Sequence, residues 1–129
     1  MVLVDTSVWI EFFRGKNQKL IEGLKDLLDK EEVSLAIPVR VEILAGTSKE
    51  KKPTLGRVLS ALPLFYPSPE TWKKIEDWIE EGLAKGERFG AMDLLIAGIA
   101  KENETSLWSL DKDFQRMVKL GWINLFQIN

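Results

Sequence analysis

Short apolar runs alternate with helix-like segments along most of this chain, and this alternation restricts the possible folds more than any other sequence feature. Residues 1–4 form an apolar run that ends at Asp5, residues 34–37 form a second run, and residues 105–110 form a third. Such runs are typical of strands that are buried on both faces. We therefore expect an α/β three-layer sandwich with a mainly parallel sheet and helices on both faces.

Helix-start signals and helical periodicity fill the segments between these runs. An amphipathic stripe covers residues 20–28, and Pro38 suits the first turn of a helix. Ser68 and Pro69 predict an N-cap and the first position of another helix. This last helix carries four apolar residues on one side: Trp72, Ile75, Ile79 and Leu83.

The remaining segments complete the alternation. Residues 64–66 are extended between two prolines, and residues 91–100 are apolar nearly all round, which predicts a central helix packed closely on its neighbours. Residues 111–119 predict a final helix and residues 123–128 a last strand. Because no linker or repeat divides the chain, residues 1–129 are expected to form a single domain.

Two residue types are missing from the chain, and their absence narrows the possible chemistry. The 129 residues include no His and no Cys, which excludes imidazole-based triads, cysteine nucleophiles and His- or Cys-ligated zinc. The formal net charge is −2, so any contact with nucleic acid has to be local. No apolar run approaches the roughly 18 residues that cross a bilayer, and we expect a cytoplasmic protein without membrane contact.

Acidic side chains follow the predicted strands or lie in the helices next to them. Asp5 ends the first run, and Glu42 lies one turn into the helix after the second. Asp93 begins the apolar helix, and Asp111 follows the third run. Ligands of open α/β sheets bind at the carboxyl ends of the strands, so we expect these four carboxylates to converge. Like charges about 4 Å apart repel by roughly 4 kcal/mol at an effective dielectric constant near 20, so the group needs a cation or protons.

An oxygen-only ligand set favours a hard divalent cation, Mg²⁺ or Mn²⁺. One or two such ions can activate a water for in-line attack on a phosphodiester, which is hydrolytic nuclease chemistry without histidine. Thr6 and Ser109 adjoin two of the acids, where their hydroxyls can orient a carboxylate or a water. Activity is then expected to decline as the pH falls towards the carboxyl pKa values.

Each acid also has an interpretation that needs no metal. Asp5 and Asp111 stand where a helix N-cap would, and Glu42 suits a solvated helix face. Asp93 and Asp113 fall in the first turn of a helix, where a negative charge is favoured. The functional interpretation is strongest for Asp93, because an ionised acid in so apolar a stretch needs a partner. Whether Asp113 shares or replaces the role of Asp111 stays open.

Four short motifs contain these acids and extend over most of the chain. They are Val4-Asp5-Thr6-Ser7-Val8-Trp9-Ile10, Val41-Glu42-Ile43-Leu44-Ala45-Gly46, Asp93-Leu94-Leu95-Ile96-Ala97 and Ser109-Leu110-Asp111-Lys112-Asp113-Phe114. Any one of them is a weak signal, but in this order and spacing the set resembles the PIN-domain family, and within it the small VapC-type toxin ribonucleases.

The resemblance implies a five-stranded parallel sheet between helices and Mg²⁺- or Mn²⁺-dependent cleavage of RNA by an endoribonuclease. It also implies a homodimer that is inhibited by a small antitoxin, as in type II toxin–antitoxin pairs. The positions that match the family's catalytic, metal-binding acids are Asp5, Glu42, Asp93 and the more variable Asp111. Thr6 and Ser109 match the positions whose hydroxyls support the site.

Three other functions stay open. A PIN nuclease of RNA processing would use the same site outside a toxin pair, and a non-catalytic protein-binding module would use the fold alone. A phospho-acceptor domain would need paired acids after the first strand, where Asp5 stands alone, and an Asp after the third, where Tyr66 and Pro67 follow. Metal-dependent RNA cleavage that is lost in Asp93→Asn would discriminate the nucleases from both other classes.

Overall fold

The computed structural model describes residues 1–128 and contains the predicted alternation of strands and helices. Asn129, the last residue of the predicted single domain, lies outside the described residues. The elements in chain order are β1 (Val2–Val4), α1 (Thr6–Arg14), α2 (Gln18–Asp29), β2 (Val33–Ala36), α3 (Ile37–Ala45), α4 (Lys52–Ser60), β3 (Leu64–Phe65), α5 (Pro69–Ala84), α6 (Ala91–Glu102), β4 (Ser106–Trp108) and α7 (Lys112–Lys119).

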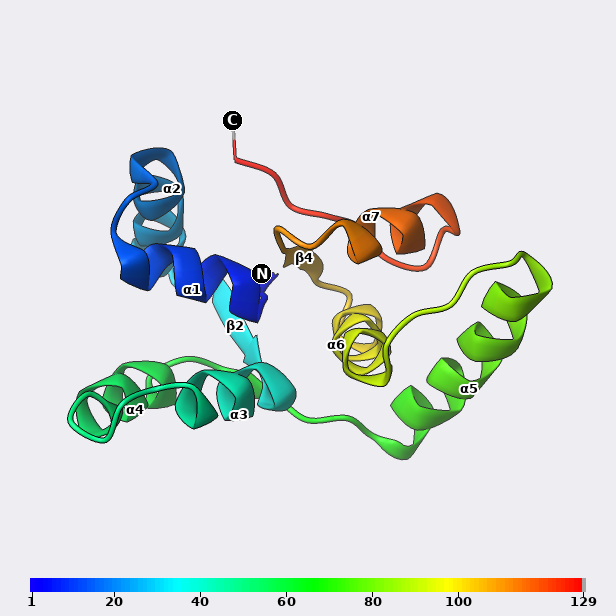
Figure 1. The fold of residues 1–129 in the computed structure, drawn as a ribbon, viewed down its shortest axis with the longest axis horizontal. Helices are drawn as coiled ribbons and strands as arrows, with labels where there is room; N and C mark the ends of the chain where they lie inside the picture. The colour runs from blue at the N-terminus through cyan, green and yellow to red at the C-terminus, as the bar shows by residue number, and fades with distance from the viewer. Residues whose placement is uncertain (129) are drawn as a thin grey trace.

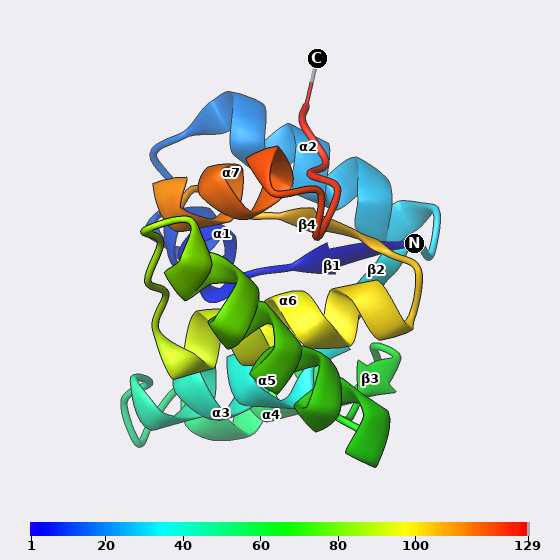
Figure 2. The ribbon, with the colours of Figure 1, turned by 90° about the vertical axis from the view of Figure 1, so that its right-hand side faces the viewer.

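The strands form a parallel sheet in the order β3-β2-β1-β4. The chain passes from β1 to β2 to β3 in one direction and then returns to place β4 on the other side of β1. Figure 1 shows α1 and α2 on one side of the strands, and α5 and α6 on the other. In Figure 2, α6 runs alongside the strands and α5 lies outside it. The strand order therefore reverses between β1 and β4, which is where open α/β sheets bind ligands.

The prediction of a fifth strand is wrong, because the sheet has four strands within residues 1–128. Residues 123–128 meet β4 at a single parallel bridge between Leu107 and Leu125. Pairing stops there because the end of the chain packs against α2 instead: a Cβ atom on Gly23 would lie only 2.6 Å from Ile128 Cγ2.

A continuous hydrophobic core joins the sheet to the helices on both of its faces. Leu3 and Leu35 from the strands, and Trp9, Ile99 and Phe114 from the helices, have no exposed surface. In the part of the chain that is described, no helix combines the length and apolarity needed to span a membrane.

Helix α5 buries a different face from the one that its apolar residues predict. Ser68 and Thr71 form the capping box at its start, as the N-cap prediction requires. The face turned to the core contains Thr71, Ile75, Trp78 and Gly82, whereas the exposed fractions of Trp72, Ile79 and Leu83 are 52%, 44% and 47%. Trp78 determines which face of α5 is buried, because its ring stacks on that of Trp122 with the centroids 4.9 Å apart.

Candidate active site

Three aspartates meet near the carboxyl ends of β1 and β4. One carboxylate oxygen from each of Asp93, Asp111 and Asp113 lies within 4.8 Å of the other two. Asp93 is in the first turn of α6, Asp111 is the N-cap of α7, and Asp113 is in the first turn of α7. The starts of two helices that are adjacent in space therefore supply all three carboxylates.

Asp5 follows β1 directly and is held by two serines. Its side chain is buried, and Oδ2 accepts hydrogen bonds from Ser7 Oγ at 2.9 Å and from Ser109 Oγ at 2.7 Å. Asp5 occupies the N-cap position of α1, but its side chain makes no capping hydrogen bond. The capping interpretation is therefore wrong for this carboxylate, which is oriented by Ser7 of α1 and by Ser109 in the loop after β4.

Ser7 is a site residue that the sequence analysis missed. Besides donating to Asp5, its Oγ lies 3.2 Å from Ser109 Oγ and accepts a hydrogen bond from the Leu110 N–H at 3.0 Å. Two hydroxyl residues, Thr6 and Ser7, follow Asp5 in the sequence. Only the pairing of β1 with β4 reveals that Ser7 is the one that reaches the loop after β4.

Glu42 lies on α3 and is exposed to solvent. The Thr6 hydroxyl donates a hydrogen bond to Glu42 Oε1 at 3.0 Å, so Thr6 orients Glu42 and not its neighbour Asp5. Both hydroxyl residues singled out in the sequence, Thr6 and Ser109, thus contact one of the predicted acids. The group within 4.8 Å contains Asp93 and Asp111 of the predicted acids, together with Asp113, but neither Asp5 nor Glu42.

The pKa of Asp93 reports how strongly the acids interact. Burial, as the largest cause, and four neighbouring negative charges together raise the pKa of this carboxyl group from its usual 3.8 to about 6. In decreasing order of effect, these charges belong to Asp111, Asp5, Asp113 and Glu42. The other acids therefore lie close enough to Asp93 to act on its charge, although not all of them enter the 4.8 Å group.

The hydrogen bonds leave part of each carboxylate free for another ligand. Asp5 and Glu42 each have one oxygen held by a hydroxyl group. Asp111 Oδ1 accepts from the Asp113 N–H at 2.9 Å, and Asp113 Oδ1 accepts from Arg116 at 3.0 Å. In each of these four acids, the second oxygen has no hydrogen-bond partner among residues 1–128. Oriented carboxylates of this kind, without nitrogen or sulfur ligands, fit a hard divalent cation such as Mg²⁺ or Mn²⁺.

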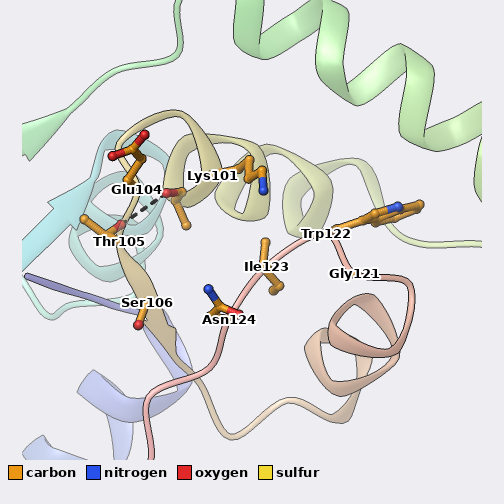
Figure 3. A pocket seen from close by; sticks show the side chains of 9 residues that line it. Lys101, Glu104, Thr105, Ser106, Gly121, Trp122, Ile123 and Asn124 are labelled. Atoms are coloured by element: carbon orange, nitrogen blue, oxygen red, sulfur yellow. Dashed lines mark hydrogen bonds between the residues drawn. The ribbon is translucent and has the colours of Figure 1, made fainter.

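Figure 3 shows a pocket at the other end of β4. Its volume is about 270 Å³, and Lys101, Ser106 and Asn124 are among its lining residues. Ser106 begins β4, whereas Asp111 and Asp113 follow the strand's opposite end at Trp108. None of the five acids lines this pocket.

Comparison with known proteins gives the same family over nearly the whole chain. The sequence profile of the PIN domain matches residues 2–120. Ribonuclease VapC32 of Mycobacterium tuberculosis is 32% identical over 114 residues, which cover 87% of this chain and 86% of that protein.

Solved structures are similar in fold at lower identity. A chain in the crystal structure of VapBC2 from Rickettsia felis, bound to a DNA fragment from the promoter, superposes with a TM-score of 0.80 at 20% identity and 98% coverage of both chains. A chain of a toxin–antitoxin complex from Klebsiella pneumoniae superposes with a TM-score of 0.72 at 17% identity, covering 88% of this chain and 90% of that one.

Proposed function

The chain belongs to the PIN domain family and is related to the VapC ribonucleases, and from this premise we propose that it is a divalent-metal-dependent endoribonuclease. The observation that carries this proposal is the group of oxygens from Asp93, Asp111 and Asp113 within 4.8 Å, at the reversal of strand order. Ribonuclease activity in the related VapC32 supports RNA as the substrate.

In this proposal the ligands of Mg²⁺ or Mn²⁺ are the catalytic acids Asp5, Glu42, Asp93 and Asp111, with Asp113 as a further oxygen donor. A bound ion supplies positive charge to a phosphodiester that gains negative charge in the transition state, and it lowers the pKa of a water. Hydrolysis requires a water molecule to approach the phosphorus in line with the departing 3′ oxygen.

The chain itself contributes orientation and control of protonation. Ser7 and Ser109 hold Asp5, and Thr6 holds Glu42, so these carboxylates keep their orientation before the ion arrives. Asp93 must be ionised to bind a cation. Because its pKa is raised to about 6, Asp93 is the group that links loss of the ion to falling pH.

We extend the proposal to the cellular role and the partners. The chain acts in the cytoplasm as the toxin of a type II pair, forms a homodimer and is inhibited by a small antitoxin. The similar folds in the VapBC2 structure and in the toxin–antitoxin complex support the proposal of an antitoxin partner. Light scattering of the purified chain, alone and with the product of a neighbouring small gene, tests both associations.

Cleavage of RNA by the purified protein tests the enzymatic proposal. We expect cleavage with Mn²⁺ or Mg²⁺, its loss in EDTA, and its recovery when Mn²⁺ is added in excess. Asp93→Asn should reduce the rate by more than about 100-fold while circular dichroism stays unchanged. Asp29→Asn removes the same charge from the exposed end of α2 and serves as the matched control. Cleavage in EDTA, or full activity of folded Asp93→Asn, would contradict the proposal.

A further inference from the structure

Arg116 on α7 links the acidic site to the loop between α5 and α6. Its guanidinium donates hydrogen bonds to Asp113 Oδ1 at 3.0 Å and to the Arg88 carbonyl oxygen at 3.2 Å, and it forms an ion pair with Glu87. The same group lies over the Phe89 ring, with Cζ 4.4 Å from the ring centroid. A single side chain thus contacts one acid of the site and three consecutive loop residues.

The contact with Asp113 fixes the orientation of a carboxylate in the proposed metal site. Arg116 holds Oδ1, and the other oxygen of Asp113 has no hydrogen-bond partner among the described residues. Partners that orient a metal-ligating side chain in this way typically contribute 10- to 100-fold to metal affinity. Arg116 is therefore placed to decide which oxygen of Asp113 is offered to a cation.

The contacts of Arg116 with the loop act on the α6 side of the site, where Asp93 lies. Glu87 and Arg88 lie just before Gly90, which is the N-cap of α6, and Asp93 follows in the first turn of that helix. Arg116 belongs to α7, which also carries Asp113. The guanidinium therefore ties the start of α6 to α7, the two elements that supply the three clustered aspartates.

We propose that Arg116 is a positioning residue that fixes the Asp113 carboxylate and the start of α6 relative to each other, so that the site accepts a divalent cation. This inference rests on the proposed function. A planar guanidinium can serve Glu87, Asp113 and the Arg88 carbonyl at the same time, whereas a lysine ammonium in its place keeps the charge but loses the fixed array of N–H donors and the position over the Phe89 ring.

The substitution Arg116→Lys separates geometry from charge. Because the positive charge is retained, its repulsion of a divalent cation changes little, and a loss of affinity reports the lost positioning. Calorimetric titration with Mn²⁺ should give an affinity about 10-fold weaker than that of the wild type. Arg14→Lys is the matched control, because Arg14 also pairs with an acid three residues earlier, Glu11, on α1.

Hydrogen exchange in the metal-free protein provides a second measurement. Arg116→Lys should speed amide exchange in residues 87–93, while Arg14→Lys should leave it unchanged there. An unchanged Mn²⁺ affinity or an unchanged exchange rate in Arg116→Lys overturns the positioning role and leaves the proposed function standing. A wild-type protein that binds no Mn²⁺ overturns the proposed metal site, and the inference with it.

Discussion

The two ends of helix α6 differ in what their side chains contribute. In the first turn, Asp93 faces the charges of the other acids, and its pKa is raised to about 6. Farther along the helix, residues 96–100 are buried, and Gly98 allows α5 to approach closely. A Cβ atom on Gly98 would lie 3.0 Å from Thr71 Cγ2 and 3.2 Å from Ile75 Cγ1.

This difference shows how the chain holds an acidic side chain in a fixed position although the neighbouring charges repel it. Without a cation, an ionised Asp93 destabilises the fold, because burial and the neighbouring charges both oppose its negative charge. The packed half of the same helix opposes any shift that would relieve this repulsion. A site built on a rigid element holds its ligands more precisely than one built on loops, and here the rigidity comes from the contact of Gly98 with α5.

The largest effect on stability is expected when a cation relieves the repulsion between the acids at the first turn of α6. Mn²⁺ at 100 times its dissociation constant should raise the free energy of unfolding of the wild type by about 2.7 kcal/mol. Asp93→Asn should lose most of this increase, because a ligand is removed. Urea denaturation with and without Mn²⁺ measures both values, and Asp29→Asn should behave like the wild type. An equal Mn²⁺ effect in Asp93→Asn would show that the first turn of α6 does not bind the ion.

The packed end predicts a somewhat smaller effect that needs no metal. Gly98→Val adds three carbon atoms where Thr71 and Ile75 leave no space, so the free energy of unfolding should fall by about 2 kcal/mol. Gly56→Val on α4 is the matched control, since a Cβ atom there meets nothing within 4 Å. Urea denaturation in EDTA measures both variants. Equal stabilities would mean that close packing does not fix this half of α6.

The sequence predicts most of the fold, because the apolar runs and helix starts are local signals. The prediction fails where contacts between residues that are distant in the sequence determine the structure. Trp78 turns α5 by stacking on Trp122, and Ile128 leaves the sheet to pack against Gly23, and neither contact can be read from nearby residues.

Some residues of the candidate site can likewise be predicted from local sequence, whereas others depend on distant contacts. Asp93 is recognisable because an acid in an apolar helix needs a partner, and Asp5 and Asp111 because they follow predicted strands. The role of Ser7 depends on the pairing of β1 with β4, which the sequence does not specify. The position of Asp113 beside Asp93 depends on how α6 and α7 meet.

The smallest predicted effect is a pH dependence that belongs to the first end of α6 alone. In the unfolded chain the pKa of Asp93 is near 3.8, whereas in the folded, metal-free protein burial and the neighbouring charges raise it to about 6, so the folded state binds more protons between these pH values. The contribution of Asp93 to the stability of the metal-free protein should therefore be highest at the acidic end of this window and fall as the pH rises to about 6. Because Asp93 is partly exposed, solvent screening limits the effect to about 1 kcal/mol.

Asp93→Asn isolates this contribution, because the amide resembles the protonated acid and does not titrate. Urea denaturation in EDTA should give nearly equal stabilities for the variant and the wild type at pH 4, and a variant that is more stable by about 1 kcal/mol at pH 7. Gly98→Val should lower stability by the same amount at both pH values, since its effect is steric. A stability difference between Asp93→Asn and the wild type that does not change with pH would mean that the first turn of α6 carries no electrostatic strain. The two ends of the helix would then differ in packing alone.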